Sequence, residues 1–422
     1  MPLPARSLWW GLCLVALSFW LTVRESYADQ VRPIRPATPT SATVDGTEKR
    51  HPRHQISQQN LLHIDRSTPY GQPATKPVGS TVAPVSLNIL AIRVDFPTDV
   101  SDETTGNGNF DYRSPAEFEQ AEGHVIDQAP HDRLYFERHL SAMNAYYDAV
   151  SYGQFSTTAR VVPDALVAAY TLPRQMSFYS PNVDFFDPLK VERLVDFVTD
   201  TFAAADQDPS IDFAAYDAFI IFHAGSDLQH DRLFNSPSDL QSGFLRIGDE
   251  RPPIRVDGGA VEIREMILMP ETTSQDSNIG ALNVTLAHEF GHQLSLPDLY
   301  STFSFAPGVG SFDLMDLESG TVDIGESGQQ IVTGVMPVNL SAWSRAFLGW
   351  LNPVEITTDS TAIGLLTSNS QAAGTKAVKI PIAPGEFFLI ENRQTDLDGD
   401  GVAFLNFVDG IVVGPSDANK TP

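Results

Sequence analysis

Cysteine is nearly absent from this chain, because Cys13 is the only one among 422 residues. One thiol cannot close an intrachain disulfide, so no disulfide framework can hold the fold together. The same scarcity excludes a metal site made of several thiolates and, beyond residue 13, any cysteine nucleophile. Stability must therefore come from a buried core, from bound ions or from both.

Basic residues are also scarce. The chain has 27 Lys and Arg residues against 53 Asp and Glu residues, which gives a formal net charge of −26. A surface this acidic repels nucleic acid and anionic membranes, so we expect neither as a partner. The acidity has two open interpretations: solubility alone, or carboxylates that bind Ca²⁺ as a structural ion.

Long apolar runs are missing except near the N-terminus, where residues 8–23 are largely apolar. A run of roughly 16 residues is shorter than the ~20 that span a bilayer. Arg6 precedes the run and Ser26-Tyr27-Ala28 follows it, an order that is typical of a secretory signal peptide. We therefore expect residues 1–28 to be a signal peptide that is cleaved after Ala28, and the protein to be secreted and extracellular. An uncleaved N-terminal anchor is the alternative.

Clustered apolar residues are also missing from residues 29–84. This segment is rich in Ser, Thr and Gln, and its prolines are Pro33, Pro36, Pro39, Pro52, Pro69, Pro73, Pro77 and Pro84. Such a composition cannot bury enough surface to offset the entropy of ordering the chain. We expect a disordered linker or a propeptide, and the sequence leaves open whether the segment inhibits the domain after it.

The next part of the chain combines helical and strand patterns. Helices are predicted at 132–150, 189–205 and 283–294, and strands at 86–96, 156–162 and 218–222. Mixed elements over about 270 residues favour one α+β domain, which we place at residues 85–352.

The pattern changes to short strands over residues 353–422. Strands are predicted there at 362–366, 377–382 and 387–391. We expect a small β-rich C-terminal region. Two alternatives stay open, a complete small region and the beginning of a larger β module.

The stretch His288-Glu289-Phe290-Gly291-His292 lies within the last predicted helix. At about 100° per residue, a spacing of four places two side chains within about 40° on one face, one turn apart. Two imidazoles in this position can direct a nitrogen at one ion, and Zn²⁺ binds neutral histidine. Glu289 lies beside this face, where it can act as the general base on a water that the metal activates. Gly291 allows the close approach of a neighbouring segment.

Chance is the alternative to this interpretation, because a short motif can also place two histidines on a helix surface. Here the motif is flanked by apolar residues, Leu286, Ala287, Phe290 and Leu294. They predict a buried helix, where two histidines and a carboxylate would be costly without a partner. The sequence therefore favours His288 and His292 as zinc ligands and Glu289 as the catalytic base.

The motif continues as Gln293-Leu294-Ser295-Leu296-Pro297-Asp298-Leu299-Tyr300, and the whole stretch resembles the active-site signature of the M6 peptidases, the immune inhibitor A type of secreted metalloprotease. Further segments are similar to this family, namely Leu90 to Pro97, Tyr146-Tyr147, Val150 to Phe155, Ile220 to Gly225, Gly310 to Asp316, Ala342-Trp343 and Leu348-Gly349-Trp350. The resemblance covers about residues 86–395. The ordered succession of these segments is more specific than any one of them.

The resemblance implies a zincin-type fold and a zinc-dependent endopeptidase that acts on protein or peptide substrates. It implies that Met315 lies in a turn beneath the metal as a structural residue and not as a ligand. The alternative is a non-catalytic extracellular binding protein on a zincin scaffold. Two positions depart from the family pattern. Ser295 stands where glycine is usual, at a point that favours left-handed backbone, and Asp316 and Leu317 follow Met315, so no tyrosine is assigned near the metal.

A catalytic zinc needs three protein ligands, and the predicted helix supplies two. Asp298 lies six residues beyond His292, past the expected helix exit, where a reversing chain can return a side chain to the histidines. The M6 resemblance favours aspartate at this position, so we expect Asp298 to be the third ligand. Glu318 and Glu326 are the rivals, which would suit zincins with a distant downstream glutamate.

Two further candidates are weaker. His223 and His230 could line a cleft or form a second metal site, but a lone histidine at a strand end is more often a core residue. Asp396, Asp398 and Asp400 open a D-x-D-x-D-G pattern that is typical of a calcium loop. Its twelfth position is a phenylalanine, which argues against an EF-hand and leaves a looser calcium site open.

The signal-peptide prediction can be tested on secreted material. We expect the mature protein to start at or near Asp29 and to contain no thiol, because Cys13 would leave with residues 1–28. N-terminal sequencing and thiol titration measure both properties. Secreted protein that still contains Cys13 would contradict the prediction.

Overall fold

The computed structural model of the chain describes residues 85–183, 187–248, 251–301, 306–316, 321–323, 331–358, 362–394, 405–408 and 411–415. The predicted signal peptide and linker lie outside these residues, as do Glu318, Glu326 and the Asp396–Asp400 pattern. Within the part that is described, no helix combines the length and the apolar content that a membrane crossing requires.

A sheet with the strand order β2-β1-β4-β8-β5 is the centre of the fold. Its strands are β1 (Val85–Asp95), β2 (Phe155–Val162), β4 (Ala218–His223), β5 (Gly243–Arg246) and β8 (Glu265–Pro270), and β3 (Tyr170–Thr171) also pairs with β1. The pairs β2-β1, β1-β4 and β4-β8 are parallel, whereas β5 is antiparallel to β8 at the edge. Central parallel strands are covered on both faces, and accordingly residues 89–94 of β1 and all of β4 are buried. The strands expected at 86–96, 156–162 and 218–222 are confirmed.

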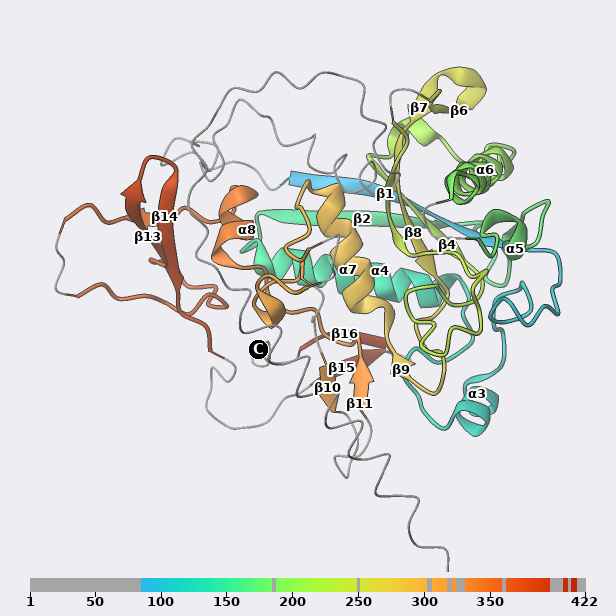
Figure 1. Cartoon of the computed structure of the whole chain (residues 1–422), viewed down its shortest axis with the longest axis horizontal. Coiled ribbons are helices and arrows are strands. Elements are labelled where there is room, and N and C mark those ends of the chain that lie inside the picture. Colours follow the sequence, from blue (N-terminus) through green and yellow to red (C-terminus); the bar gives the residue numbers. More distant parts are fainter. Residues whose placement is uncertain are drawn as a thin grey trace, which may run out of the picture. The chain divides into compact units, whose positions relative to one another are not determined.

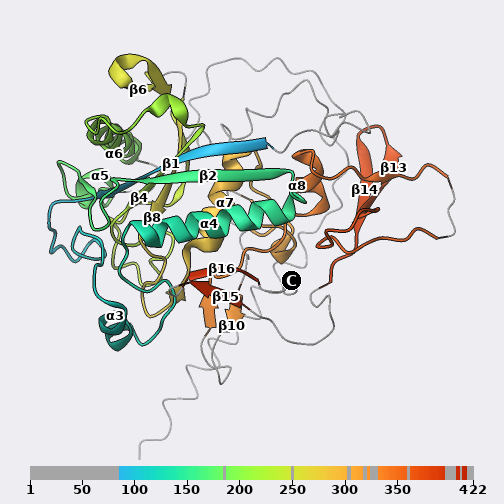
Figure 2. The same ribbon diagram turned by 180° about the vertical axis from the view of Figure 1, so that it is seen from behind.

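Helices cover both faces of this sheet. Helix α4 (Arg133–Val150) contacts β2 and α7 (Leu282–Gln293), and α7 contacts β8 and β5. Helix α6 (Pro188–Ala205) contacts β1, and it lies on the other side of the sheet (Figure 1, Figure 2). The three long helices were all predicted, within one or two residues of their ends.

Side-chain caps explain where two of these helices begin. The Asp132 carboxylate accepts hydrogen bonds from the backbone N–H groups of Leu134 and Tyr135, and Asp187 accepts one from Leu189. Each cap satisfies donors of the first turn that have no partner inside the helix. Large apolar side chains of α4 and α6, such as Phe136 and Phe197, are fully buried against the sheet.

Helix α3 (Pro115–Glu122) was not predicted from the sequence, which gave no helix between the strand at 86–96 and the helix at 132–150. Ser114 and Glu117 form a capping box, in which each side chain accepts a hydrogen bond from the other residue's backbone N–H. Proline occupies the first turn, where its missing N–H costs nothing. The Ser-Pro-Ala-Glu sequence was therefore a usable signal for this helix.

The C-terminal strands agree with the prediction only in part. Strands β13 (Ala377–Ala383) and β14 (Glu386–Glu391) form an antiparallel hairpin, and β12 (Val354–Glu355) pairs with β13. The strand expected at 362–366 is wrong, because this segment pairs with no strand among the described residues and Thr367 beside it forms a single bridge with Asn392. Arg345 of α8 (Ala342–Phe347) is fully buried, and its Nη2 lies 2.6 Å from a Glu391 carboxylate oxygen.

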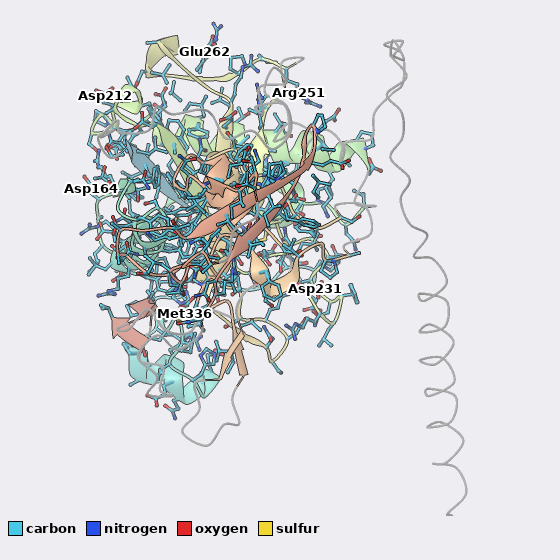
Figure 3. All side chains as sticks on the ribbon, turned by 90° about the vertical axis from the view of Figure 1, so that its left-hand side faces the viewer. Asp164, Asp212, Asp231, Arg251, Glu262 and Met336 are labelled. Carbon is cyan, nitrogen blue, oxygen red and sulfur yellow. The ribbon has the colours of Figure 1, made fainter. Side chains whose placement is uncertain are left out.

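Shorter elements complete the fold. They are α5 (Met176–Tyr179), β6 (Ile254–Val256), β7 (Val261–Ile263), β9 (Ile279–Gly280), β10 (Thr321–Asp323), β11 (Ile331–Thr333), β15 (Leu405–Val408), β16 (Ile411–Pro415) and the 3-10 turns Phe213–Ala215, Asp257–Gly259 and Gly310–Phe312. Helices and strands are thus mixed along the chain, as expected for the α+β class. Acidic side chains such as Asp164, Asp212 and Glu262 lie at the periphery (Figure 3), which fits the strongly negative charge of the sequence.

Candidate metal centre

Helix α7 places His288 and His292 one turn apart on the same face. Their rings lie 5.0 Å apart between centroids. The helix is held in place by its fully buried apolar residues Leu286 and Phe290. The hydroxyl of Tyr147 on α4 donates a 2.6 Å hydrogen bond to the carbonyl of Ala287 and fixes the helix from the side.

Each histidine is oriented by a backbone carbonyl. His288 Nδ1 donates to the Leu314 carbonyl at 2.9 Å, and His292 Nδ1 donates to the Leu296 carbonyl at 2.8 Å. A carbonyl only accepts, so Nδ1 carries the hydrogen in both rings and Nε2 is the nitrogen that remains for a ligand interaction. This arrangement is the one by which proteins orient metal-binding histidines.

The end of α7 returns the chain to the histidines. Ser295 has a left-handed backbone with φ of 72°, as its position in the family pattern suggested. Ser295 N–H donates to the His292 carbonyl and Leu296 N–H donates to the Gly291 carbonyl, at 2.8 and 3.0 Å. These two bonds form a Schellman motif, after which the chain turns back.

Asp298 lies at the end of this return. Its Oδ1 is 3.3 Å from His288 Nε2 and 3.2 Å from His292 Nε2, and the three ligand atoms all lie within 4.8 Å of one another. This buried oxygen accepts no well-formed hydrogen bond from the residues that the structure describes. In a tetrahedral zinc site with bonds of about 2.0–2.2 Å, neighbouring ligand atoms lie roughly 3.3–3.6 Å apart. The distances from Asp298 Oδ1 to the two nitrogens therefore match ligands of one metal ion better than they match hydrogen bonds between the side chains.

The charges of these groups are strongly coupled. Burial lowers the pKa of His288, but the adjacent Asp298 and Glu289 carboxylates raise it to about 9. Burial raises the pKa of Asp298, and the two histidines reverse this and hold it well below its usual range. In the ion-free protein, the His288 contribution to stability is fully present below about pH 6.5 and is lost as the pH rises through about 9. A bound cation would replace the proton that holds the carboxylate and the rings together.

Met315 packs against the helix between the two histidines. A Cβ added to Gly291 would come 2.5 Å from Met315 Sδ, so only glycine permits this contact. The turn that carries Met315 is fixed because its N–H donates to Asp313 and its carbonyl accepts from Leu299 N–H. The sequence predicted that a neighbouring segment comes close to Gly291, and this is confirmed. Met315 packs against the helix there, which is compatible with the structural role that the resemblance implied for it.

Glu289 faces the edge of the sheet. Its Oε2 accepts a 2.7 Å hydrogen bond from the backbone N–H of Phe244 on β5. The side chain is partly exposed, and it does not belong to the group of three converging ligand atoms. Glu289 is therefore placed beside the candidate metal position.

The start of α7 is held by residues that the sequence did not reveal. Asp127 Oδ2 accepts a 2.8 Å hydrogen bond from Leu282 N–H, while the residue before the helix, Ala281, offers no side-chain cap. His139 Nδ1 donates to Asn283 Oδ1 at 2.9 Å. Asp127 and Leu282 are 155 residues apart, so no local pattern could have linked this carboxylate to the helix.

The other histidine candidates have structural roles. His223 is fully buried, packs near Phe96 and Phe197, and donates from Nδ1 to the Ala224 carbonyl at 3.0 Å. His230 Nδ1 lies 2.5 Å from the buried Asp227 carboxylate. In the described part of the chain, His288, His292 and Asp298 form the one group of three such side chains that could hold a metal.

A scan against protein-family models and a search of curated proteins find no match for this chain. The chemistry of the centre is accordingly inferred from the geometry of its own residues.

The geometry predicts that Asp298 is needed to retain the metal. Asp298→Ala removes one of three ligands, so zinc affinity should fall by more than about 100-fold. Metal analysis after dialysis against a weak chelator measures the loss. Glu318→Ala and Glu326→Ala are the matched controls and should keep the metal. A zinc-loaded Asp298→Ala protein would show that another residue is the ligand.

The left-handed turn predicts an effect on stability. Ser295→Gly should raise the free energy of unfolding by about 0.5–1 kcal/mol, because a left-handed residue with a Cβ costs roughly 1–2 kcal/mol and glycine returns part of this as unfolded-chain entropy. Urea unfolding of the metal-free protein measures the change. Ser295→Val should shift stability in the opposite direction, and equal stability of the two variants would contradict the assignment.

Proposed function

We propose that the protein is a secreted zinc-dependent endopeptidase of the zincin type. The observation that carries this proposal is the convergence of His288, His292 and Asp298 beside Glu289. When bound, a zinc ion supplies Lewis acidity that polarises a carbonyl and makes water acidic enough to deprotonate near neutral pH.

The donor set favours zinc over harder cations. Two imidazole nitrogens and one carboxylate oxygen suit Zn²⁺, whereas Ca²⁺ and Mg²⁺ prefer ligands that are all oxygen. Three protein ligands leave one position open, which is typical of a catalytic site and not of a structural one. Asp298 Oδ1 is buried without a hydrogen bond from the described residues, so a bound cation would stabilise its negative charge.

The edge strand β5 suggests how a substrate lies. Phe244 N–H donates to Glu289 and not to β8, so this side of β5 faces the catalytic groups. A strand at the edge of a sheet offers unpaired backbone groups, and an extended peptide can pair with them. We infer that a polypeptide binds along β5, which brings one of its peptide bonds next to Glu289.

Glu289 moves the proton in this reaction. Its carboxylate accepts a proton from the attacking water, whose oxygen forms a bond to the scissile carbonyl carbon. The protonated Glu289 then donates this proton to the peptide nitrogen as the C–N bond breaks. The products are a carboxylic acid and an amine, and Glu289 returns to its ionised form.

The resemblance to M6 peptidases supports the same assignment, because its ordered segments include both the histidine motif and the turn that carries Met315. Secretion is part of the proposal and is supported by the predicted signal peptide. A non-catalytic binding protein on the same scaffold would have no use for a carboxylate beside an open metal position. Glu289 is thus the residue that separates the two functions.

Glu289→Gln tests the catalytic role. The variant should keep its zinc and its fold but lose about 10²–10⁴-fold in peptide hydrolysis, because a neutral amide cannot accept the proton from water. A casein zymogram with and without chelator, followed by rates on a peptide library, measures the loss. The exposed Glu262→Gln is the control and should retain full activity. Hydrolysis at the normal rate by pure, zinc-loaded Glu289→Gln would refute the proposal.

A further inference from the structure

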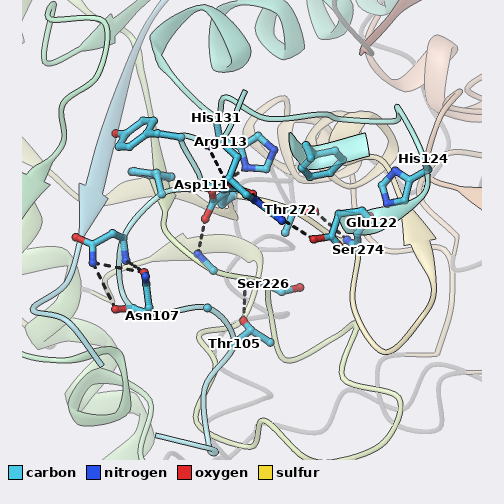
Figure 4. Close-up of a pocket in the computed structure, with 17 residues that line it drawn as sticks. Thr105, Asn107, Asp111, Arg113, Glu122, His124, His131, Ser226, Thr272 and Ser274 are labelled. Atoms are coloured by element: carbon cyan, nitrogen blue, oxygen red, sulfur yellow. Dashed lines mark hydrogen bonds and ion pairs between the residues drawn. The ribbon is translucent and has the colours of Figure 1, made fainter. Parts of the chain in front are cut away.

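A pocket of about 520 Å³ lies where three parallel strands end. Its walls come from the loops that follow β1, β4 and β8, together with α3 and the residues just before α4. Figure 4 shows Asn107 at one end of the view, His124 at the other end, and Arg113 and Asp111 between them. The volume is within the range of roughly 300–1,000 Å³ that is usual for small-molecule sites.

The topology of the sheet marks this place for ligand binding. From β1 the chain passes through α4 to β2 on one side, whereas β4 and β8 lie on the other side of β1. The direction of the strand order therefore changes between β1 and β4. Open parallel sheets bind ligands in the crevice that forms at the carboxyl ends of the strands at such a point.

Glu271 makes the pocket a fixed structure. Its Oε1 accepts from Asp111 N–H and lies 2.7 Å from His131 Nδ1, and its Oε2 accepts from Gly225 N–H at 2.9 Å. These contacts join the loops after all three strands. His131 Nε2 also faces an acceptor, the carbonyl of Asp127 at 2.9 Å. Burial lowers the pKa of His131, but the adjacent Glu271 carboxylate outweighs burial and raises it, which favours a cationic ring that donates from both nitrogens.

A second ion-pair group forms the rim. Arg113 Nη2 lies 2.6 Å from an Asp111 oxygen and 2.8 Å from a Glu122 oxygen, and its Cζ lies 5.3 Å from the centre of the Phe118 ring. Arg113 Nε also donates to Asp111. Within the described residues, Arg113 Nη1 makes no hydrogen bond.

Each charged group of the pocket thus already faces an opposite charge, because Glu271 faces His131 while Asp111 and Glu122 share Arg113. A charged ligand would have to leave water without finding an unpaired counter-ion, which is costly. The groups that remain for a ligand are the donors Arg113 Nη1 and Asn107 Nδ2 and the acceptors Asn109 Oδ1 and the Glu122 carboxylate. Among the residues that the structure describes, Asn107 Nδ2 and Asn109 Oδ1 have no hydrogen-bond partner.

We propose that this pocket binds a neutral polyhydroxylated molecule, a mono- or disaccharide. A hydroxyl group both donates and accepts, so adjacent hydroxyls match a pocket whose lining offers both donors and acceptors. The fixed loops around Glu271 mean that little ordering is needed when the ligand enters.

This site is separate from the metal centre. Phe244, which contacts Glu289, pairs with Ile267 in β8, and Glu271 follows four residues later. At about 3.3 Å per residue, the two positions are roughly 13 Å apart along the strand. Saccharide binding in the pocket therefore does not depend on the proposed peptidase function.

Calorimetric titration of the full mature protein tests the proposal, with glucose, N-acetylglucosamine and maltose as probes. We expect at least one of them to bind. Glu122→Gln and Asn109→Ala should each weaken that binding by about tenfold, which is the effect of losing one good hydrogen bond. Asn182→Ala, an exposed asparagine outside the pocket, should leave binding unchanged. Zinc content and peptide hydrolysis should be the same in all three variants.

Three results would overturn the proposal. The first is that none of the saccharides binds. The second is that a saccharide binds equally well to the wild type, Glu122→Gln and Asn109→Ala, because the site would then lie elsewhere. The third is that acetate, putrescine or Ca²⁺ binds and the saccharides do not, because the pocket would then hold a charged ligand.

Discussion

Two imidazoles and one carboxylate share a buried space at the end of α7, and the carboxylate oxygen lies about equally far from both Nε2 atoms. A buried carboxylate oxygen without a well-formed hydrogen bond is costly, and a cation would relieve that cost. Much of the surrounding architecture serves to keep these three groups together. The carbonyls of Leu296 and Leu314 orient the rings, and the turn at Ser295 returns the aspartate.

The helix that carries the histidines is held along its whole length. Asp127 satisfies the first N–H of the helix, Tyr147 bonds to a carbonyl in its middle, and the Schellman motif closes its end. Met315 then fills the space against Gly291. Three of these contacts come from distant parts of the chain, at Asp127, Tyr147 and Met315, so the position of each histidine depends on the packed fold and not on the helix alone. Such support is what a preorganised site requires.

The fold contains two polar sites, the candidate metal centre on α7 and the pocket beside Glu271, and their charges are arranged differently. At the candidate metal centre one carboxylate oxygen lies between two imidazole nitrogens without a well-formed hydrogen bond to either, an arrangement that a cation would complete. In the pocket beside Glu271 each carboxylate already faces a cation, with Arg113 shared by Asp111 and Glu122, which favours a neutral ligand. The difference follows from what surrounds each carboxylate: Asp298 faces two nitrogens that point at one position, whereas Glu271 accepts two backbone N–H groups and faces one imidazolium.

The sequence by itself determined the long helices, the buried parallel strands and the histidine motif, because the period of apolar residues and a spacing of four are local properties. It also indicated the left-handed turn at Ser295 and pointed to Asp298. Helix α3 was not predicted, although the Ser114–Glu117 capping box is a local signal for it. The strand predicted at 362–366 pairs with no strand among the described residues. Only the tertiary structure decided three features: the hydrogen bond from Leu282 N–H to Asp127 at the start of α7, the contact of Phe244 with Glu289, and the pocket around Glu271. Each of these joins segments that are tens to more than a hundred residues apart, and such pairings depend on how the sheet orders its strands.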